Sequence, residues 1–205
     1  MRILSPDQVR ALDERTMAEL GLPAVLLMET AGRALAEVAL QRWQESRRST
    51  PRTALVLCGQ GNNGGDGFVA ARWLADAGVQ VQVWGVGNAD RLSAASHVHL
   101  RAIQALDLPC RWLSAREPEV GLALLRAAVR EHDLVLDALA GIGLAGPLRE
   151  PLRSVVTLLA DEVPGLVVAA DIPSGLDART GKVHGVVVRA DVTVAMAAAK
   201  PGLWL

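Results

Sequence analysis

The stretch Thr53-Ala54-Leu55-Val56-Leu57-Cys58-Gly59-Gln60-Gly61-Asn62-Asn63-Gly64-Gly65-Asp66-Gly67 decides the fold. Its opening residues, 53–58, form a compact apolar run with β-branched side chains, which predicts a buried strand. The glycines that follow permit a tight turn, and residues 67–77 have the pattern of a helix. A buried strand, a glycine-rich turn and a helix in this order form the first unit of an α/β domain.

Further strands and helices are expected along the rest of the chain. Strands are predicted at 79–86, 110–113, 134–139 and 166–171, with more at 186–188 and 191–196, and helices at 93–106, 117–131 and 147–162. Strands that alternate with helices imply a mostly parallel sheet covered by helices on both faces. We therefore expect an α/β fold, a three-layer αβα Rossmann-like domain. No internal repeat or linker is found, so residues 1–205 are expected to form a single domain.

Two helices are expected before the first strand. Ser5 is a capping residue, Pro6 suits the first helical position, and Gln8 completes a capping box, so a helix is predicted over 6–19. Apolar residues at helical spacing predict a second helix over about 23–45. Both helices lie outside the simplest alternation, so we expect them to cover a sheet edge or a partner subunit.

The composition is that of an ordinary globular protein, 51% hydrophobic and 21% charged, with a formal net charge of −1. This balance gives no electrostatic footprint for nucleic acid or for an anionic membrane surface. No apolar run approaches the ~18 residues of a transmembrane helix, and none follows Arg2 as in a signal peptide. A cytoplasmic protein is therefore expected, with Cys58 and Cys110 as free thiols.

The first of three loops with unusual residues is the glycine-rich one after Cys58. In an open α/β sheet, ligands bind beyond the carboxyl ends of the strands, where this loop lies. It matches the dinucleotide fingerprint Gly59-x-Gly61-x-x-Gly64, but the second strand ends in Trp84-Gly85-Val86-Gly87, without the acid that binds a ribose. A Rossmann dehydrogenase is therefore disfavoured. A glycine-rich turn that only caps a helix is the alternative interpretation.

The other two loops carry carboxylates at predicted strand ends. Asp137 follows an apolar strand, where a carboxylate is costly unless it is paired, hydrogen-bonded or bound to a cation. An Asp that accepts backbone amides in a turn is the structural alternative. Asp171 ends the next strand, and Ser174 follows it without the surroundings of a nucleophile, so it is interpreted as a polar ligand or turn residue.

These loops match a known pattern in order. The segments are Gly59-Gln60-Gly61-Asn62-Asn63-Gly64-Gly65-Asp66-Gly67, Asp137-Ala138-Leu139-Ala140-Gly141-Ile142-Gly143 and Asp171-Ile172-Pro173-Ser174-Gly175-Leu176-Asp177. They resemble the signature blocks of the NAD(P)H-hydrate epimerase family, the YjeF N-terminal domain. The resemblance extends to Met28-Glu29-Thr30-Ala31-Gly32, to Thr193-Val194-Ala195-Met196 and to Ala199-Lys200-Pro201-Gly202-Leu203.

The resemblance implies an isomerase that repairs hydrated nicotinamide cofactors by interconverting the R and S forms of NADHX or NADPHX. It implies that the substrate is bound by two loops and a strand end, through Asn62, Asn63, Gly64, Gly65, Asp66, Gly141, Ile142, Gly143, Leu144, Ala145, Gly146, Pro147 and Asp171. It also implies a potassium ion held by Asn63, Asp137 and Ser174, whose oxygens suit a hard cation. A homodimer through the leading helices and a fused or separate dehydratase are the partners that it implies.

For mechanism, the hypothesis is that the ring nitrogen assists departure of the substrate hydroxyl, and water returns to either face of a planar iminium. Asp171 would give and take the proton as general acid and base. Ring opening and reclosure at the same carbon is an alternative. A non-catalytic nucleotide-binding or dimerisation module of the same fold is the rival function. Ile142 and Ala140 depart from the family pattern, and a chain ending at Leu205 is expected to be the front of a longer bifunctional protein or a truncated one.

Overall fold

The computed structural model describes residues 2–45, 53–113, 118–144, 146–161 and 163–205. Its strands are β1 (Thr53–Cys58), β2 (Gln80–Val86), β3 (Cys110–Leu113), β4 (Leu134–Ala138), β5 (Leu166–Ala170) and β6 (Val192–Val194). Its longer helices are α1 (Pro6–Leu20), α2 (Ala24–Glu45), α3 (Asn62–Asp76), α4 (Ala94–Ala105), α5 (Pro118–Glu131) and α6 (Leu152–Asp161). No helix within these ranges is long and apolar enough to cross a membrane.

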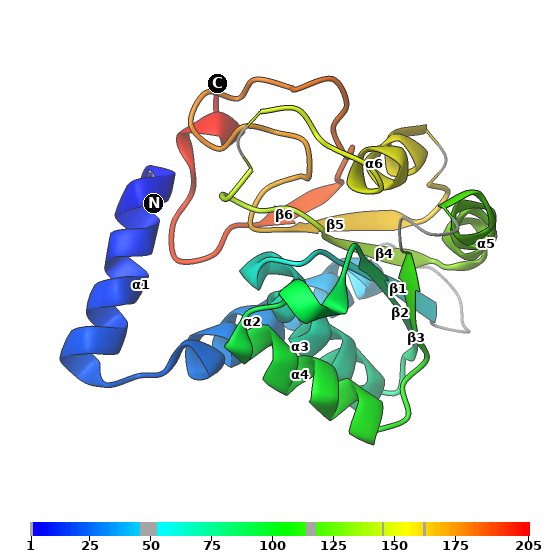
Figure 1. Ribbon diagram of the computed structural model, residues 1–205, viewed down its shortest axis with the longest axis horizontal. Helices are drawn as coiled ribbons and strands as arrows, with labels where there is room; N and C mark the ends of the chain where they lie inside the picture. Colours follow the sequence, from blue (N-terminus) through cyan, green and yellow to red (C-terminus); the bar gives the residue numbers. More distant parts are fainter. Residues whose placement is uncertain (1, 46–52, 114–117, 145, 162) are drawn as a thin grey trace.

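The strands form one sheet in the order β3-β2-β1-β4-β5-β6, and every neighbouring pair is parallel. Helices α2, α3 and α4 cover one face, while α5 and α6 cover the other (Figure 1). The expected three-layer αβα arrangement is therefore confirmed. Because the chain winds outward in both directions from β1 and β4, a crevice opens beyond their carboxyl ends, where ligands bind in such sheets.

Strand β1 lies at the centre of the core. Leu55 and Leu57 pack into the layer that contains α5 and α6, whereas Val56 and Cys58 pack into the layer that contains α3. Burial on both faces explains why this strand is continuously apolar instead of alternating. Cys58 and Cys110 are free thiols, as expected.

Helices α2 and α3 pack unusually closely, and this contact holds the start of α3 in place. At Gly32 of α2, an added Cβ would lie 2.4 Å from Val69 Cβ and 2.5 Å from the Asp66 backbone oxygen. Beside this crossing, Glu29 pairs with Arg72 and accepts a 2.7 Å hydrogen bond from the Trp73 indole. The Met28–Gly32 segment of the sequence is thus the surface on which α3 rests.

Helix α1 stands to one side of the layered body (Figure 1). Its capping box of Ser5 and Gln8 is formed as predicted. Only Pro6 and Val9 of this helix are buried, and Leu20 is 69% exposed. Of the two expected leading helices, α2 therefore belongs to the layer on one sheet face, and α1 alone projects.

Several predicted boundaries were wrong. Helix α3 begins at Asn62 instead of residue 67, since the glycine-rich stretch already forms its first turns. Residues 186–188 form no strand, and α6 begins at Leu152 instead of residue 147. Strand β5 ends at Ala170, because Asp171 turns the chain with a φ of 66°.

Replacing Gly32 with alanine should lower the free energy of unfolding by about 1–3 kcal/mol, because the new methyl group meets the backbone of α3. Urea unfolding followed by circular dichroism measures the change. Gly121→Ala in α5 is the matched control, since its added Cβ meets only the tip of the Leu113 side chain. Equal effects of the two substitutions would contradict the proposed close contact of α2 and α3.

Candidate active site

The glycine-rich turn after β1, residues 59–61, packs against the loop that follows β4. An added Cβ at Gly59 would lie 1.8 Å from the Leu139 backbone oxygen, and one at Gly64 would lie 2.0 Å from the Gly59 oxygen. The Gly59 amide also donates to the Ala138 oxygen at 3.0 Å. Side chains at these positions would force the loops apart, so glycine is required by close backbone approach.

Helix α3 begins directly after this glycine-rich turn, at Asn62. Its capping position, Gly61, offers no side-chain hydrogen bond to the first amides of the helix. Uncapped amides at the start of a helix of this length attract an anion, because the peptide dipoles add to their charge. The start of α3 is therefore suited to phosphate.

Asp137, at the end of β4, is completely buried. Its oxygens accept hydrogen bonds from the Ser174 amide at 2.8 Å, the Ser174 hydroxyl at 2.6 Å and the Leu139 amide at 3.2 Å. Burial raises the pKa of Asp137 to about 6, and these hydrogen bonds oppose the rise. None of the groups that lower its pKa is a basic side chain.

Asn63 brings an amide group to the same region from α3. An added Cβ at Gly141 would lie 3.2 Å from Asn63 Oδ1, so the amide rests against the loop after β4. The Asn63 Nδ2 atom is buried without a hydrogen-bond partner in the described part of the chain. Asp137, Ser174 and Asn63 supply carboxylate, hydroxyl and amide oxygens, which are the donors that a hard monovalent cation requires. Among the described residues, no basic side chain lowers the pKa of the buried carboxylate. The residues therefore fit potassium chemically.

Asp171 occupies a left-handed backbone conformation with φ 66°, which Asp and Asn adopt more readily than most residues. Its Oδ1 accepts a hydrogen bond from the Met196 amide at 3.1 Å and pairs with the Lys200 ammonium. The side chain is only 9% exposed, and Lys200 is completely buried. These two contacts hold the Oδ1 atom of Asp171 in place.

Two further carboxylates lie near Asp171. Burial first, and then the Asp171 charge, raises the pKa of Asp13 from α1. Burial, followed by the charges of Asp171 and Asp13, raises the pKa of Asp66 from α3 well above its ordinary value. Lys200 opposes both shifts. Three acidic side chains therefore lie near one buried ammonium, which pairs with Asp171.

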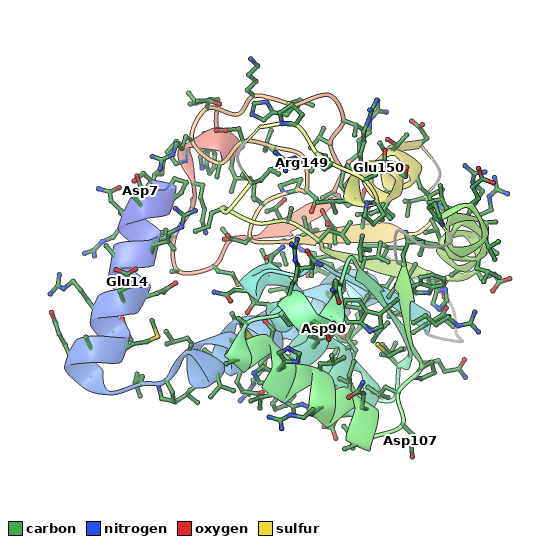
Figure 2. All side chains as sticks on the ribbon, in the orientation of Figure 1. Asp7, Glu14, Asp90, Asp107, Arg149 and Glu150 are labelled. Carbon is green, nitrogen blue, oxygen red and sulfur yellow. The ribbon has the colours of Figure 1, made fainter. Side chains whose placement is uncertain are left out.

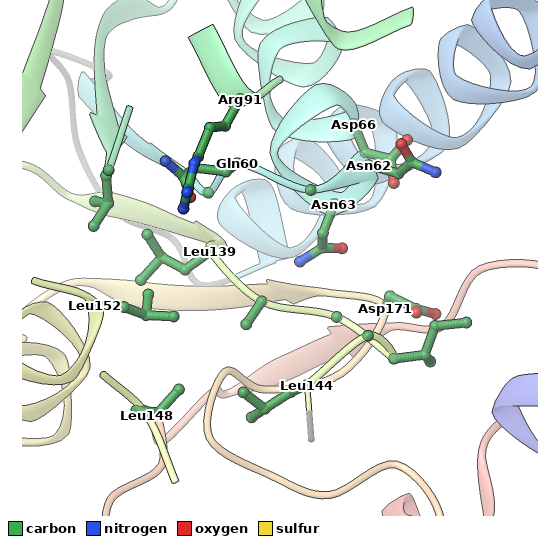
Figure 3. A pocket seen from close by; sticks show the side chains of 18 of the residues that line it. Gln60, Asn62, Asn63, Asp66, Arg91, Leu139, Leu144, Leu148, Leu152 and Asp171 are labelled. Carbon is green, nitrogen blue, oxygen red and sulfur yellow. The ribbon is translucent and has the colours of Figure 1, made fainter. Parts of the chain in front are cut away.

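Asp171, Asp13, Asp66 and Asn63 line one cavity of about 690 Å³, a volume typical of small-molecule sites. Figure 3 shows Asp171 at one end, Asn63 in the middle, and Arg91 beside Gln60 at the other end. Arg149 and its neighbour Glu150 come from the segment before α6 (Figure 2) and also line the cavity. The cavity therefore has an acidic end at Asp171 and a more basic end at Arg91.

The residues predicted to bind substrate fall into two groups in the structure. Those that line the cavity are Asn62, Asn63, Asp66, Gly141, Ile142, Gly143, Leu144, Pro147 and Asp171. Gly64 and Gly65 are buried against Gly59 and Met28, and Gly146 lies outside the lining. Ala145 lies outside the described residues. Of the residues predicted to hold potassium, Asp137 and Ser174 are in direct contact behind the cavity wall.

Sequence reasoning missed Asp13, Arg91 and the role of Lys200. A signal for Asp13 was present, since it follows the buried Val9 by one helical turn and therefore shares its face. Arg91 lies in the short helix after β2, and no pattern in the sequence connects it to the glycine turn. Lys200 reaches Asp171 only through the tertiary fold.

The geometry agrees with the comparisons to known proteins. The sequence pattern of a family described as YjeF-related protein N-terminus matches residues 25–202. The chain belongs to this family. The crystal structure of the yeast protein ynu0 (YNL200c) superposes with a TM-score of 0.85 and 26% identity, covering 99% of this chain and 83% of that one.

Curated relatives carry names that concern NAD(P)H hydrates. The bifunctional NAD(P)H-hydrate repair enzyme Nnr of Salinibacter ruber is 43% identical over 207 residues, which cover 98% of this chain and 37% of that protein. The NAD(P)H-hydrate epimerase of Limosilactobacillus fermentum is 34% identical over 197 residues, covering 96% of this chain and 86% of that protein. The chain therefore spans little more than a third of the bifunctional relative and most of the epimerase.

Proposed function

We propose that this protein is an NAD(P)H-hydrate epimerase, an isomerase that interconverts the R and S forms of NADHX and NADPHX. The observation that carries the proposal is the presence of Asp171 in one cavity with the uncapped start of α3 and the loop containing Gly141. A buried reactive carboxylate beside an anion-binding helix start suits a substrate with a reacting ring and phosphates. The names of the relatives support the same reaction.

The charge distribution of the cavity supports one orientation of the substrate. Its phosphates would bind the amides at the start of α3 and the guanidinium of Arg91, because both attract anions. The hydrated ring, which becomes cationic during the reaction, would then lie at the acidic end, against Asp171. The reverse orientation would bring the phosphates close to Asp13, Asp66 and Asp171.

The chemistry proposed at Asp171 is proton transfer. The carbon–oxygen bond to the hydroxyl breaks, the oxygen takes a proton from Asp171 and leaves as water, and the ring nitrogen lone pair forms a carbon–nitrogen double bond. Water then adds to either face of the planar cation and returns a proton to Asp171. Addition to the opposite face gives the epimer, so protons, atoms and electrons balance over the cycle.

Asp171→Asn should lower kcat for epimerisation by about 10²–10⁴-fold, the usual contribution of a general acid and base. Asparagine tolerates the left-handed backbone at this position, so nucleotide binding should be largely kept. NMR or chiral chromatography of purified R and S hydrates measures the rate, and calorimetry measures binding. Asp107→Asn is the matched control, since Asp107 also has a positive φ, 51°, and lies far from the cavity (Figure 2). Near-full activity of Asp171→Asn would refute the assignment.

We also propose that Asn63, Asp137 and Ser174 hold a potassium ion. Bound there, the ion would supply positive charge that compensates the buried carboxylate and the nearby phosphates. The protein itself positions the surrounding loops. The Ser174 hydroxyl donates a hydrogen bond to Asp137 and accepts one from the Ala140 amide at 2.8 Å, and the second bond fixes the loop before Gly141.

Potassium should raise the melting temperature at pH 7.5 by several degrees, and much less at pH 5. Burial raises the pKa of Asp137 to about 6, above its ordinary value, so the stability contributed by its protonated form is lost as the pH rises through about 6. A cation binds the ionised form and therefore stabilises the fold only above this range. Scanning calorimetry in potassium or tetramethylammonium chloride tests this, and Asp137→Asn should abolish the difference. Equal melting temperatures of the wild type in both salts at pH 7.5 would rule out the site.

Two partners are part of the proposal. The first is an NAD(P)HX dehydratase, fused or separate, because a single epimerase domain over residues 1–205 would only supply the epimer that such an enzyme consumes. The bifunctional relatives support this pairing. The second is another copy of this chain, bound through the leading helices, where Leu20 and Leu26 are 69% and 45% exposed.

Light scattering should give twice the chain mass of 21.7 kDa. Leu20→Glu should yield the monomer, because the charge would be buried in the interface. Leu106→Glu is the control, since Leu106 is 56% exposed at the far end of α4. A monomeric wild type at micromolar concentration would disprove the dimer.

A further inference from the structure

Lys200 is a completely buried lysine in a chain that almost never uses lysine. Of the 21 basic residues, only Lys182 and Lys200 are lysines, and the others are arginines. Lys182 is exposed, whereas Lys200 is among the largest fully buried side chains of the described residues. A buried ammonium is costly unless it is paired and hydrogen-bonded, so its presence requires a specific partner.

That partner is Asp171. The Lys200 Nζ atom pairs with Asp171 Oδ1 and donates to the Met196 backbone oxygen at 2.7 Å. The Met196 amide donates to the same Oδ1 at 3.1 Å. A compact ammonium on an unbranched stem fits between these groups, while the planar guanidinium of arginine is larger and differently shaped.

The other carboxylate oxygen, Oδ2, remains for the cavity. No hydrogen bond to Asp171 Oδ2 is found within the described ranges, and Asp171 lines the cavity (Figure 3). Lys200 itself does not line the cavity and is 0% exposed. It therefore acts on a bound molecule only through Asp171.

The fold secures this arrangement from both ends of the chain. Ala199, the residue before Lys200, forms a parallel bridge with Ile3, and its oxygen accepts the Leu4 amide at 2.9 Å. Helix α1, which carries Asp13, begins at Pro6, shortly after Ile3 and Leu4. The short helix Pro201–Leu203 follows, and the Gly202 amide donates to the Ala178 oxygen at 2.9 Å.

The charges that face Asp171 come from each element around it. Asp13 and Arg10 lie on α1, Asp66 lies on α3, and Lys200 lies on the C-terminal segment. Arg10 donates to the Ile142 oxygen at 3.2 Å, on the loop after β4. Among these groups, Lys200 is the buried cation that pairs directly with the Asp171 carboxylate.

On the basis of the proposed epimerase function, we infer that Lys200 is a positioning residue for the reaction: it holds one oxygen of Asp171 and stabilises the carboxylate that forms when the substrate hydroxyl leaves. The planar cation of the substrate exists while Asp171 is ionised. Stabilising that carboxylate makes proton donation easier, and fixing Oδ1 directs Oδ2 to the substrate hydroxyl.

The test replaces Lys200 with methionine, which has a similar length and no charge. We expect kcat to fall by roughly tenfold or more, with KM changed little because Lys200 cannot touch the substrate. The ionisation in the pH–kcat profile that belongs to Asp171 should move to higher pH, because an opposite charge has been removed. Lys182→Met, at the only other lysine of the chain, should match the wild type.

A second variant separates charge from packing. Lys200→Gln keeps an N–H donor for Asp171 but removes the charge, so it should show the same shift in the pH profile. It also serves if the methionine variant does not fold. An active wild type whose two Lys200 variants keep the normal kcat and pH profile would overturn the role of Lys200 while leaving the proposed function intact.

The effect of Lys200 on Asp171 can also be measured without substrate, so this test holds even if the proposed function is wrong. In protein with carbon-13 labelled aspartate, the Asp171 carboxyl resonance is identified by its absence from Asp171→Asn. Its titration midpoint should lie at higher pH in Lys200→Met and Lys200→Gln than in the wild type. Unchanged midpoints would overturn the inference, and a wild type that does not interconvert the hydrates would overturn the epimerase proposal.

Discussion

The hydrogen bonds between Asp137 and Ser174 organise the carboxyl end of the sheet. A carboxylate at the end of β4 is buried completely, and three donors from two loops converge on it. Ser174 also binds the Ala140 amide, so the same group fixes the loop after β4. Only Ile172 and Pro173 separate Asp171 from Ser174, so the contacts of Ser174 also restrict the position of Asp171.

Desolvation gives this region its chemical character. Burial raises the pKa of Asp137, Asp13 and Asp66, because carboxylates lose the water that stabilises their charge. Asp171 has a different environment, with a buried ammonium and a backbone amide on one oxygen. Neighbouring carboxyl groups that differ in this way suit acid–base chemistry, in which one group must change its protonation while others keep theirs.

Close packing of neighbouring backbones contributes to the burial of these side chains. Gly59, Gly64 and Gly32 each sit where a side chain would collide with the backbone of a neighbouring segment. The glycines of the turn are therefore needed as much for packing as for phosphate approach. This explains why Gly64 and Gly65, which the sequence pattern associates with substrate, lie behind the cavity wall.

The sequence by itself determined the α/β architecture, the order of strands and helices, and the three strand ends at which chemistry was expected. These depend on local apolar patterns and turn residues, which are readable along the chain. The start of α3 at Asn62 was missed because glycines oppose a helix locally, and the contacts with α2 and β1 outweigh that preference.

Only the tertiary structure decided that Lys200 faces Asp171 and that Asp13 and Arg91 line the same cavity. Lys200 and Asp171 are 29 positions apart, and their pairing depends on burial and on the bridge between Ile3 and Ala199, which no local pattern encodes.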